Sequence, residues 1–251
     1  MSKVNLDLKQ MFEAGVHFGH FKRRWHPNMS NFIHSIHNGR CIIDLTATKQ
    51  ALEEILPIIT AAVSQGNKVL MVGTKRQTKS LIEETASALS MPYVTNRWVG
   101  GMLTNNATIN IRIKKLKDLE QKMASGELVS KYNKLEVQNY QKTIDNLNRL
   151  YGGIKEMNKL PGLVFITDMQ TNAIAVTEAN KLNIPIVALA DTNVDPTLAT
   201  YPIPANDDAL RSLELIINLI SEAIKTGQNQ LSKSVESEAD EQEVVNQSKE
   251  V

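Results

Sequence analysis

Three histidines, three basic residues and a tryptophan gather in the segment GVHFGHFKRRWHPNM, residues 15–29. Such side chains could bind a metal through imidazole nitrogens, act in acid–base catalysis, or hold a negatively charged ligand. All five histidines of the chain lie between residues 17 and 37, and no acidic residue occurs between Glu13 and Asp44. A basic segment without acidic neighbours favours an anionic partner.

A metal site is the first alternative. His17 and His20 have H-x-x-H spacing, and His26 could supply a third ligand. Structural zinc sites usually recruit cysteine, however, and Cys41 is the only cysteine of the chain. The basic neighbours would also repel a cation. We therefore expect no cofactor, with structural zinc or magnesium as the less favoured alternative.

An enzyme is the second alternative. The segment KVLMVGTKRQTKSL, residues 68–81, could place a phosphate at a helix start, but it lacks both common glycine-rich phosphate motifs. Acidic residues that end strands or follow them could bind Mg²⁺ and support phosphoryl transfer. These are Asp168, Asp191, Asp195, Asp207 and Asp208. No nucleophile–base pair accompanies them, so a nucleotide- or metal-dependent phosphotransfer enzyme is the alternative and we expect no enzyme.

RNA binding explains more of the sequence. Clusters of Lys and Arg with interleaved aromatic residues recur along the chain, and such side chains contact phosphates and stack on unpaired bases. The predicted RNA-binding residues are Lys22, Arg23, Arg24, Trp25, His26, Lys75, Arg76, Lys79, Arg97, Trp98, Arg112, Lys114, Lys115 and Lys117. Each cluster alone could be a solvated face. Trp98 could instead be a buried anchor, and Trp25 could pack into the core.

The elements that position these residues indicate an α/β fold. Buried strands are predicted at 40–45, 68–74, 163–168 and 184–191, with shorter ones at 93–95 and 201–204. The last of these contains two prolines and suits only a sheet edge. The strands at 68–74, 163–168 and 184–191 are apolar on both faces, which is typical of a parallel sheet.

Helical patterns lie between these strands, at 47–64, 77–89 and 171–182, with Pro57 expected to kink the first. A last helix should begin at Asn206 as N-cap. The alternation predicts a doubly wound parallel sheet with right-handed crossovers. We assign residues 1–104 and 160–228 to this domain.

Residues 105–159 break the alternation. Two heptad-like apolar runs flank a polar turn at 124–134, and Glu120 interrupts the first run. This pattern predicts an inserted antiparallel helical hairpin with a coiled-coil seam. Four basic residues cluster in RIKKLK, residues 112–117.

Charge is unevenly distributed. The chain has a formal net charge of +1, but residues 229–251 contain six acidic residues against two lysines. This segment has no aromatic residue, so we predict a disordered acidic tail. The N-terminus lacks a signal-peptide core and no apolar run is long enough for a membrane helix, which predicts a cytoplasmic protein without a membrane partner.

The motifs together resemble a known family. In order, they are AGVHFGH, WHPNM, VGTKR, NRWVGGMLTN, LYGGIKEM, LPGLVFITD, EANKLNIPIVALADTNVDP and IPANDDALRS. They are similar to the bacterial and organellar family of small-ribosomal-subunit protein "S two", across about residues 6–226.

The resemblance implies a flavodoxin-like domain with a protruding coiled-coil hairpin. It also implies a structural protein of the ribosome, located between head and body on 16S ribosomal RNA. The family helps to recruit the large mobile ribosomal protein "S one", so other small-subunit proteins are expected partners, with no small-molecule substrate.

Overall fold

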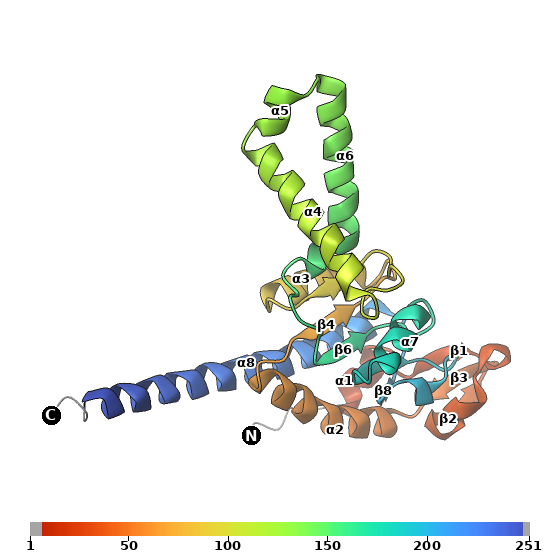
Figure 1. Ribbon diagram of the computed structural model, residues 1–251. Coiled ribbons are helices and arrows are strands. Elements are labelled where there is room, and N and C mark those ends of the chain that lie inside the picture. The colour runs from red at the N-terminus through yellow and green to blue at the C-terminus, as the bar shows by residue number, and fades with distance from the viewer. Residues whose placement is uncertain (1–6, 248–251) are drawn as a thin grey trace.

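A parallel sheet of five strands forms the centre of the protein in the computed structural model (Figure 1). The structure describes residues 7–247, with side chains described as far as Lys233. The strand order is β5-β4-β6-β7-β8, and every neighbouring pair is parallel. The strands are β4 (Val69–Val72), β5 (Tyr93–Val94), β6 (Leu163–Ile166), β7 (Ile186–Ala190) and β8 (Tyr201–Pro204). The predicted parallel sheet is confirmed, and the proline-containing β8 lies at its edge.

Alternating side chains of these strands enter two hydrophobic clusters. In β4, Val69 and Met71 join one cluster, whereas Leu70 and Val72 join the other. The first cluster includes side chains of α1 (Leu8–Glu13), α2 (Leu45–Ser64), α3 (Lys79–Ala88) and α8 (Leu210–Gln247). The second includes α7 (Ala173–Lys181) and the base of the helical insertion. Helices on both faces explain why the strands are apolar throughout.

The segment 40–45 does not belong to this sheet, although the sequence predicts a buried strand there. β3 (Arg40–Ile43) is the central strand of a separate antiparallel sheet, between β1 (Phe18–Phe21) and β2 (Ile33–His37). β1 and β2 were not predicted, because they are short and rich in polar residues. The turn Asn38–Gly39, with both φ angles positive, is the hairpin signal that would have found them.

The predicted helices are present, with shifted starts. α2 continues through Pro57 as one helix. α8 begins at Leu210 rather than at the predicted cap, but the Asn206 side chain accepts hydrogen bonds from the backbone N–H groups of Asp208 and Ala209. α8 runs on to Gln247, through most of the segment 229–251. Residues 248–251 and the side chains beyond Lys233 lie outside the described part of the chain, so the disordered tail stays a prediction.

Three helices stand between β5 and β6 and project from the sheet (Figure 1): α4 (Asn106–Ala124), α5 (Glu127–Lys131) and α6 (Lys134–Tyr151). The predicted polar turn at 124–134 therefore contains the short helix α5. Buried apolar residues of α4 and α6 lie in the same cluster as strands β4 and β6. The hairpin base thus shares the core of the α/β domain, and its coiled-coil character and the boundaries 105–159 stay predictions.

Glu120, which interrupts the predicted seam, has partners across the hairpin. Its carboxylate accepts hydrogen bonds from Asn148 at 2.6 Å and from Lys155 at 2.8 Å. Burial raises the pKa of Glu120, but these two donors outweigh burial and hold the pKa below its ordinary value.

No helix among residues 7–247 is long and apolar enough to span a membrane.

Candidate nucleic-acid interface

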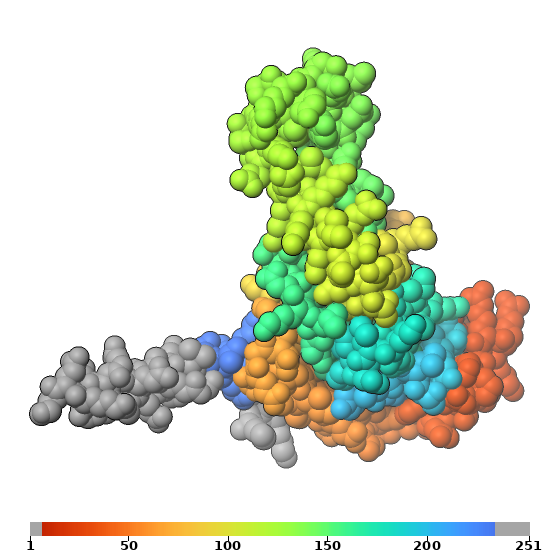
Figure 2. All heavy atoms as spheres, in the orientation of Figure 1, coloured from red at the N-terminus to blue at the C-terminus, as the bar shows by residue number. Residues whose placement is uncertain are grey.

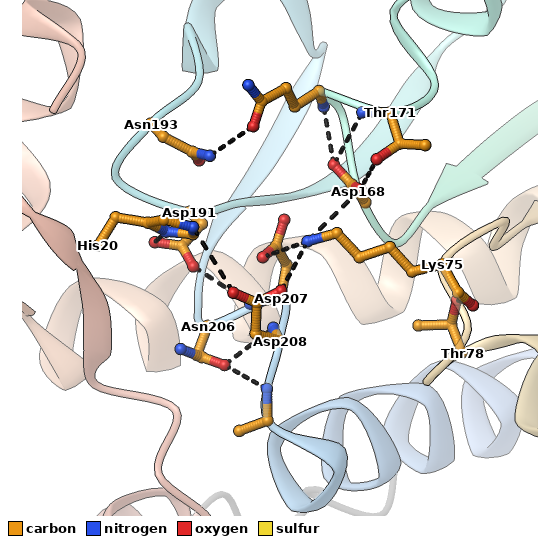
Figure 3. A network of polar contacts seen from close by, with 12 residues as sticks. His20, Lys75, Thr78, Asp168, Thr171, Asp191, Asn193, Asn206, Asp207 and Asp208 are labelled. Atoms are coloured by element: carbon orange, nitrogen blue, oxygen red, sulfur yellow. Dashed lines mark hydrogen bonds and ion pairs between the residues drawn. The ribbon is translucent and has the colours of Figure 1, made fainter. Parts of the chain in front are cut away.

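The carboxyl ends of four strands bring acidic residues together around one lysine (Figure 3). Asp168 follows β6, Asp191 follows β7, and Asp207 and Asp208 follow β8. Lys75 comes from the loop after β4. Parallel strands end on the same side of a sheet, and this brings together acidic residues that the sequence predicts at strand ends or just after them.

Lys75 is the centre of this strand-end network. Its Nζ lies 2.8 Å from Asp207 Oδ1, 2.9 Å from Asp208 Oδ1 and 3.4 Å from Asp168 Oδ2. Burial lowers the pKa of Lys75, but the surrounding carboxylates, Asp207 foremost, raise it by more, so the net shift is upward. Lys75 is therefore a permanent cation held inside the molecule, not a free contact for phosphate.

Asp207 is a buried carboxylate of the network with a raised pKa. Burial, together with repulsion from Asp191, raises the pKa of Asp207 to about 7, although Lys75 opposes the shift. Asp168 has partners of its own: the backbone N–H groups of Gln170 and Thr171 donate to it at 2.8 and 3.1 Å, and the Thr171 hydroxyl also donates. Asp207 therefore has a raised pKa although it makes the shortest ion pair with Lys75.

His20 connects this network to the antiparallel sheet. Its Nδ1 lies 3.1 Å from Asp191 Oδ1 and its Nε2 lies 3.6 Å from Asp208 Oδ2. Asp191 is the main cause of a raised pKa of His20, which favours the imidazolium form. The backbone N–H of His20 donates to the Thr192 hydroxyl at 2.9 Å. Polar contacts thus connect β1 to the end of β7.

The three candidate zinc ligands have separate surroundings. His17 is buried and stacks in parallel on Phe12, with ring centroids 4.4 Å apart, and burial lowers its pKa. His20 faces the carboxylates, whereas His26 accepts a hydrogen bond from the backbone N–H of Asn28. Within the described part of the chain, no group of three His, Cys, Asp or Glu side chains is arranged to hold a metal ion. The geometry assigns these histidines to packing and local polar contacts.

The opening basic segment lies at the surface. Lys22, Arg23 and Arg24 form an exposed 3₁₀ turn directly after β1, and none of them has an ion-pair partner among the described residues. The Arg23 guanidinium lies 5.7 Å from the centre of the Phe21 ring, and that of Arg40 lies 4.6 Å from it. This turn is open to an anionic ligand.

The hairpin carries a second exposed basic set. Arg112, Lys114 and Lys115 are exposed on α4 without an ion-pair partner in the described residues. Lys117 pairs with Glu156, with 2.9 Å between Nζ and Oε1. Figures 1 and 2 show the hairpin and the antiparallel sheet projecting from different parts of the molecule. The two basic sets therefore face separate regions of any partner.

The two tryptophans are not equivalent. Trp98 is buried, and its Nε1 donates to Glu178 Oε1 at 3.1 Å, although part of the residue lines a cavity at the base of the hairpin. This is the buried-anchor alternative of the sequence analysis. Trp25 is half-buried and packs against the cluster that contains β4 and β6. Its packing supports the core role for Trp25 over a free stacking surface.

Glu178 is a functional candidate that the sequence reasoning missed. This buried carboxylate of α7 receives hydrogen bonds from the Trp98 indole, from the backbone N–H groups of Gly101, Leu103 and Thr104, and from the Thr104 hydroxyl. Burial raises the pKa of Glu178, but these donors outweigh burial and lower the pKa. The glycines of NRWVGGMLTN and a lone acid on an apolar helix face were the available signals. Glu178 fixes the loop that leads into the hairpin.

Arg76, Lys79 and Arg97 complete the predicted set. Arg76 and Arg97 are exposed, and Lys79 is half-buried at the start of α3. Lys79 and Arg97 line one cavity together with Arg149 of α6, which the sequence analysis did not single out. The structure thus brings part of the predicted basic set together and leaves the rest on separate surfaces.

Comparison with known proteins agrees with this picture. The family model described as Ribosomal protein S2 matches residues 11–227. The small ribosomal subunit protein uS2 of Fusobacterium nucleatum is 44% identical over 236 residues, covering 94% of this chain and 95% of the relative. That of Coprothermobacter proteolyticus is 46% identical over 231 residues, covering 92% and 86%. Because the family model and these relatives match most of the chain, the chain belongs to the ribosomal protein S2 family.

Proposed function

We propose that this protein is a structural constituent of the small ribosomal subunit, where it binds 16S ribosomal RNA between head and body. The observation that carries the proposal is the pair of exposed basic sets without carboxylate partners, on η1 (Lys22–Arg24) and on α4. Exposed cations without an ion-pair partner contribute little to folding stability. They contribute much to RNA affinity, because phosphate contacts release the counterions of the RNA.

The family consists of structural ribosomal proteins rather than enzymes, and this removes the phosphotransfer alternative. The strand-end network supports the same conclusion from chemistry. Lys75 already pairs with three of the carboxylates that would have bound a metal–nucleotide complex, and hydrogen bonds engage Asp168 on both oxygens. Because these side chains already have partners within the protein, they stabilise the fold rather than bind a ligand.

The proposed phosphate contacts differ from the predicted list. We keep the residues that are exposed and have no ion-pair partner among the described residues. We leave out Lys75, because carboxylates hold it, and Trp98, because it is buried. Trp25 is also left out as a stacking residue. The proposed contacts are Lys22, Arg23, Arg24, Arg76, Arg97, Arg112, Lys114 and Lys115. Contacts on two projecting parts suit a folded RNA, since phosphate contacts mainly set register and orientation.

We also propose contact with a neighbouring ribosomal protein, namely the large mobile protein "S one". Three phenylalanines near the N-terminus are well exposed: Phe12 at 61%, Phe18 at 49% and Phe21 at 41%. The Phe12 and Phe18 rings both contact the His17 ring, with ring centroids 4.4 and 4.0 Å apart. Exposed aromatic side chains are typical of protein–protein interfaces. Phe12→Ser with Phe18→Ser should weaken capture of "S one" in a pull-down but leave RNA affinity unchanged.

RNA binding is tested with 16S ribosomal RNA over a range of salt concentrations. Arg23→Ala with Arg24→Ala should weaken binding and reduce the salt slope by about 0.7–0.9 for each phosphate that the variant no longer neutralises. Lys181→Ala with Lys225→Ala removes the same charge from α7 and α8 and serves as the control. An affinity that barely depends on salt, or clear nucleotide hydrolysis by the wild-type protein, would contradict the proposed function.

A further inference from the structure

A cavity of about 650 Å³ lies where the hairpin joins the α/β domain. Ile174 at the start of α7 forms part of its lining, and the rest comes from three elements that are distant in sequence: the start of α3, the loop 96–100 and the end of α6. These elements contribute Lys79, Arg97 and Arg149 in turn. No acidic side chain lines the cavity. Three cations around one cavity without an acid indicate an anionic ligand.

These cations are not engaged with carboxylates elsewhere. Among the described residues, no ion pair involves Lys79, Arg97 or Arg149. Arg149 does donate to Asn146 Oδ1 at 3.0 Å, a neutral acceptor one turn earlier on the same helix. This differs from Lys75, which lies within ion-pair distance of three carboxylates. The cavity cations keep their full capacity to bind an anion.

The wall of the cavity also has apolar parts. Val99 and Leu150 are partly buried against the hydrophobic core, and Ile174 at the start of α7 is 56% exposed. A cavity that combines an apolar wall with cationic groups fits a ligand that has a flat apolar part and a negative charge. A nucleotide that is unstacked from an RNA chain has both, in its base and its phosphate.

The loop that forms one side of the cavity is preorganised. Glu178 fixes residues 98–104 through five hydrogen bonds, and the Asn96 side chain donates to the backbone carbonyl of Arg149 at 2.9 Å. The second interaction ties the loop directly to the end of the hairpin. A site held in place before binding loses less conformational entropy when a ligand enters.

We propose that this hairpin-base cavity, with Lys79, Arg97 and Arg149, is the binding site for one unstacked nucleotide of the ribosomal RNA. The phosphate lies among the three cations, and the base lies against Val99, Leu150 and Ile174. The inference rests on the proposed RNA binding. Because the cavity lies between α3 and α6, an occupied cavity also fixes the hairpin on the sheet domain.

The test uses the full chain and 16S ribosomal RNA. Arg97→Gln with Arg149→Gln should lower the salt slope by about 1.4–1.8, because each removed cation reduces the slope by about 0.7–0.9. Arg211→Gln with Lys225→Gln, both on α8 and outside the cavity lining, is the charge-matched control. Thermal melts of all variants establish that they remain folded.

A second variant separates the cavity from its charges. Ile174→Trp partly fills the cavity without changing charge, and the exposure of Ile174 makes the substitution tolerable for the fold. It should weaken RNA binding by about fivefold or more, since a base stacked on a protein side chain is worth about 1–3 kcal/mol of binding, and leave the melting temperature unchanged. Wild-type affinity in Ile174→Trp, or a double arginine variant that matches its control, would overturn the nucleotide site. Steep salt dependence in the wild-type protein would still support the proposed function in either case.

Discussion

Two charged regions of this protein follow opposite electrostatic designs. In the strand-end network, Lys75 and His20 lie within ion-pair distance of four carboxylates, three of which are buried. In the hairpin-base cavity, Lys79, Arg97 and Arg149 face a space without acids. The network lies where active sites of α/β proteins lie, but its charged groups pair with one another. The cavity has no recognisable sequence motif, but its cations have no ion-pair partner among the described residues. Position at the end of a sheet therefore indicates where a site could form, and unpaired charge indicates whether one is available.

The largest expected effect comes from breaking the network. Lys75→Met leaves two buried carboxylates, Asp168 and Asp207, without their cation, so it should lower the free energy of unfolding by about 3–5 kcal/mol. Lys49→Met is the control, because Lys49 pairs with Glu53 only at the surface, at 3.9 Å. Urea unfolding measures both. A loss for Lys75→Met as small as that of the control would mean that the network is not a structural device.

Adding Asp207→Asn to Lys75→Met should restore part of the lost stability. Asp207 is the carboxylate with the raised pKa, and its neutral amide needs no cation. The double variant also distinguishes the loss of an ion pair from a simple packing defect. No recovery in the double variant would assign the effect of Lys75 to its aliphatic stem.

A somewhat smaller effect is expected at Glu178, which links the core to the cavity loop. Glu178→Gln replaces one acceptor oxygen by an NH₂ group facing N–H donors, at a cost of about 1–3 kcal/mol for each buried donor left unsatisfied. Glu84→Gln on the exposed face of α3 is the control. Because the pKa of Glu178 is lowered by folding, its stabilisation is present above its ordinary pKa and lost as pH falls through the folded value. Glu178→Gln should therefore flatten the acid limb of the stability profile, and an unchanged acid limb would contradict this assignment.

Near neutral pH the network should give the opposite slope. Folding raises the pKa of Asp207 from 3.8 to about 7, so between these values the folded protein binds more protons than the unfolded chain. The free energy of unfolding should consequently fall as pH rises from about 4 to 7, by about 1–2 kcal/mol because neighbouring carboxylates share the proton. His20 acts in the same direction, since its raised pKa gives stability that is lost as pH rises through the folded value.

Asp207→Asn should remove most of this slope, whereas Asp145→Asn on the exposed hairpin surface should not. Urea unfolding at several pH values makes the comparison. A wild-type protein whose stability rises steadily over this range would show that Asp207 stays ionised.

The smallest effect on stability is expected at the open cavity. Arg97→Gln and Arg149→Gln remove charges that have no ion-pair partner in the described structure, so the free energy of unfolding should change by less than about 0.5 kcal/mol. Thermal melts measure this change. A large loss of stability in either variant would mean that the cavity, like the network, serves the fold.

Sequence patterns predicted much of the fold. β4, β6 and β7 were found because a strand covered by helices on both sides must be apolar on both faces. The antiparallel sheet was missed because β1 and β2 are short and carry histidines, and their stabilisation comes from pairing with β3 rather than from an apolar pattern. The helix α5 was missed inside the hairpin turn, where five residues give too little periodicity to detect.

For the candidate site, residue type alone determined which side chains could bind an anion, because the charge of Arg and Lys does not depend on the fold. It also placed Asp168 and Asp191 at strand ends and carried the family resemblance across most of the chain. Availability depended on tertiary structure: Lys75 and Arg97 look equivalent in sequence, but only Lys75 is surrounded by carboxylates. Likewise, Glu178 accepts hydrogen bonds from Trp98 and Leu103, which lie about 75 to 80 positions away in the sequence. These bonds anchor Trp98 and fix the loop that leads into the hairpin. Such long-range interactions decide whether a charge is neutralised or exposed, and no local pattern encodes them.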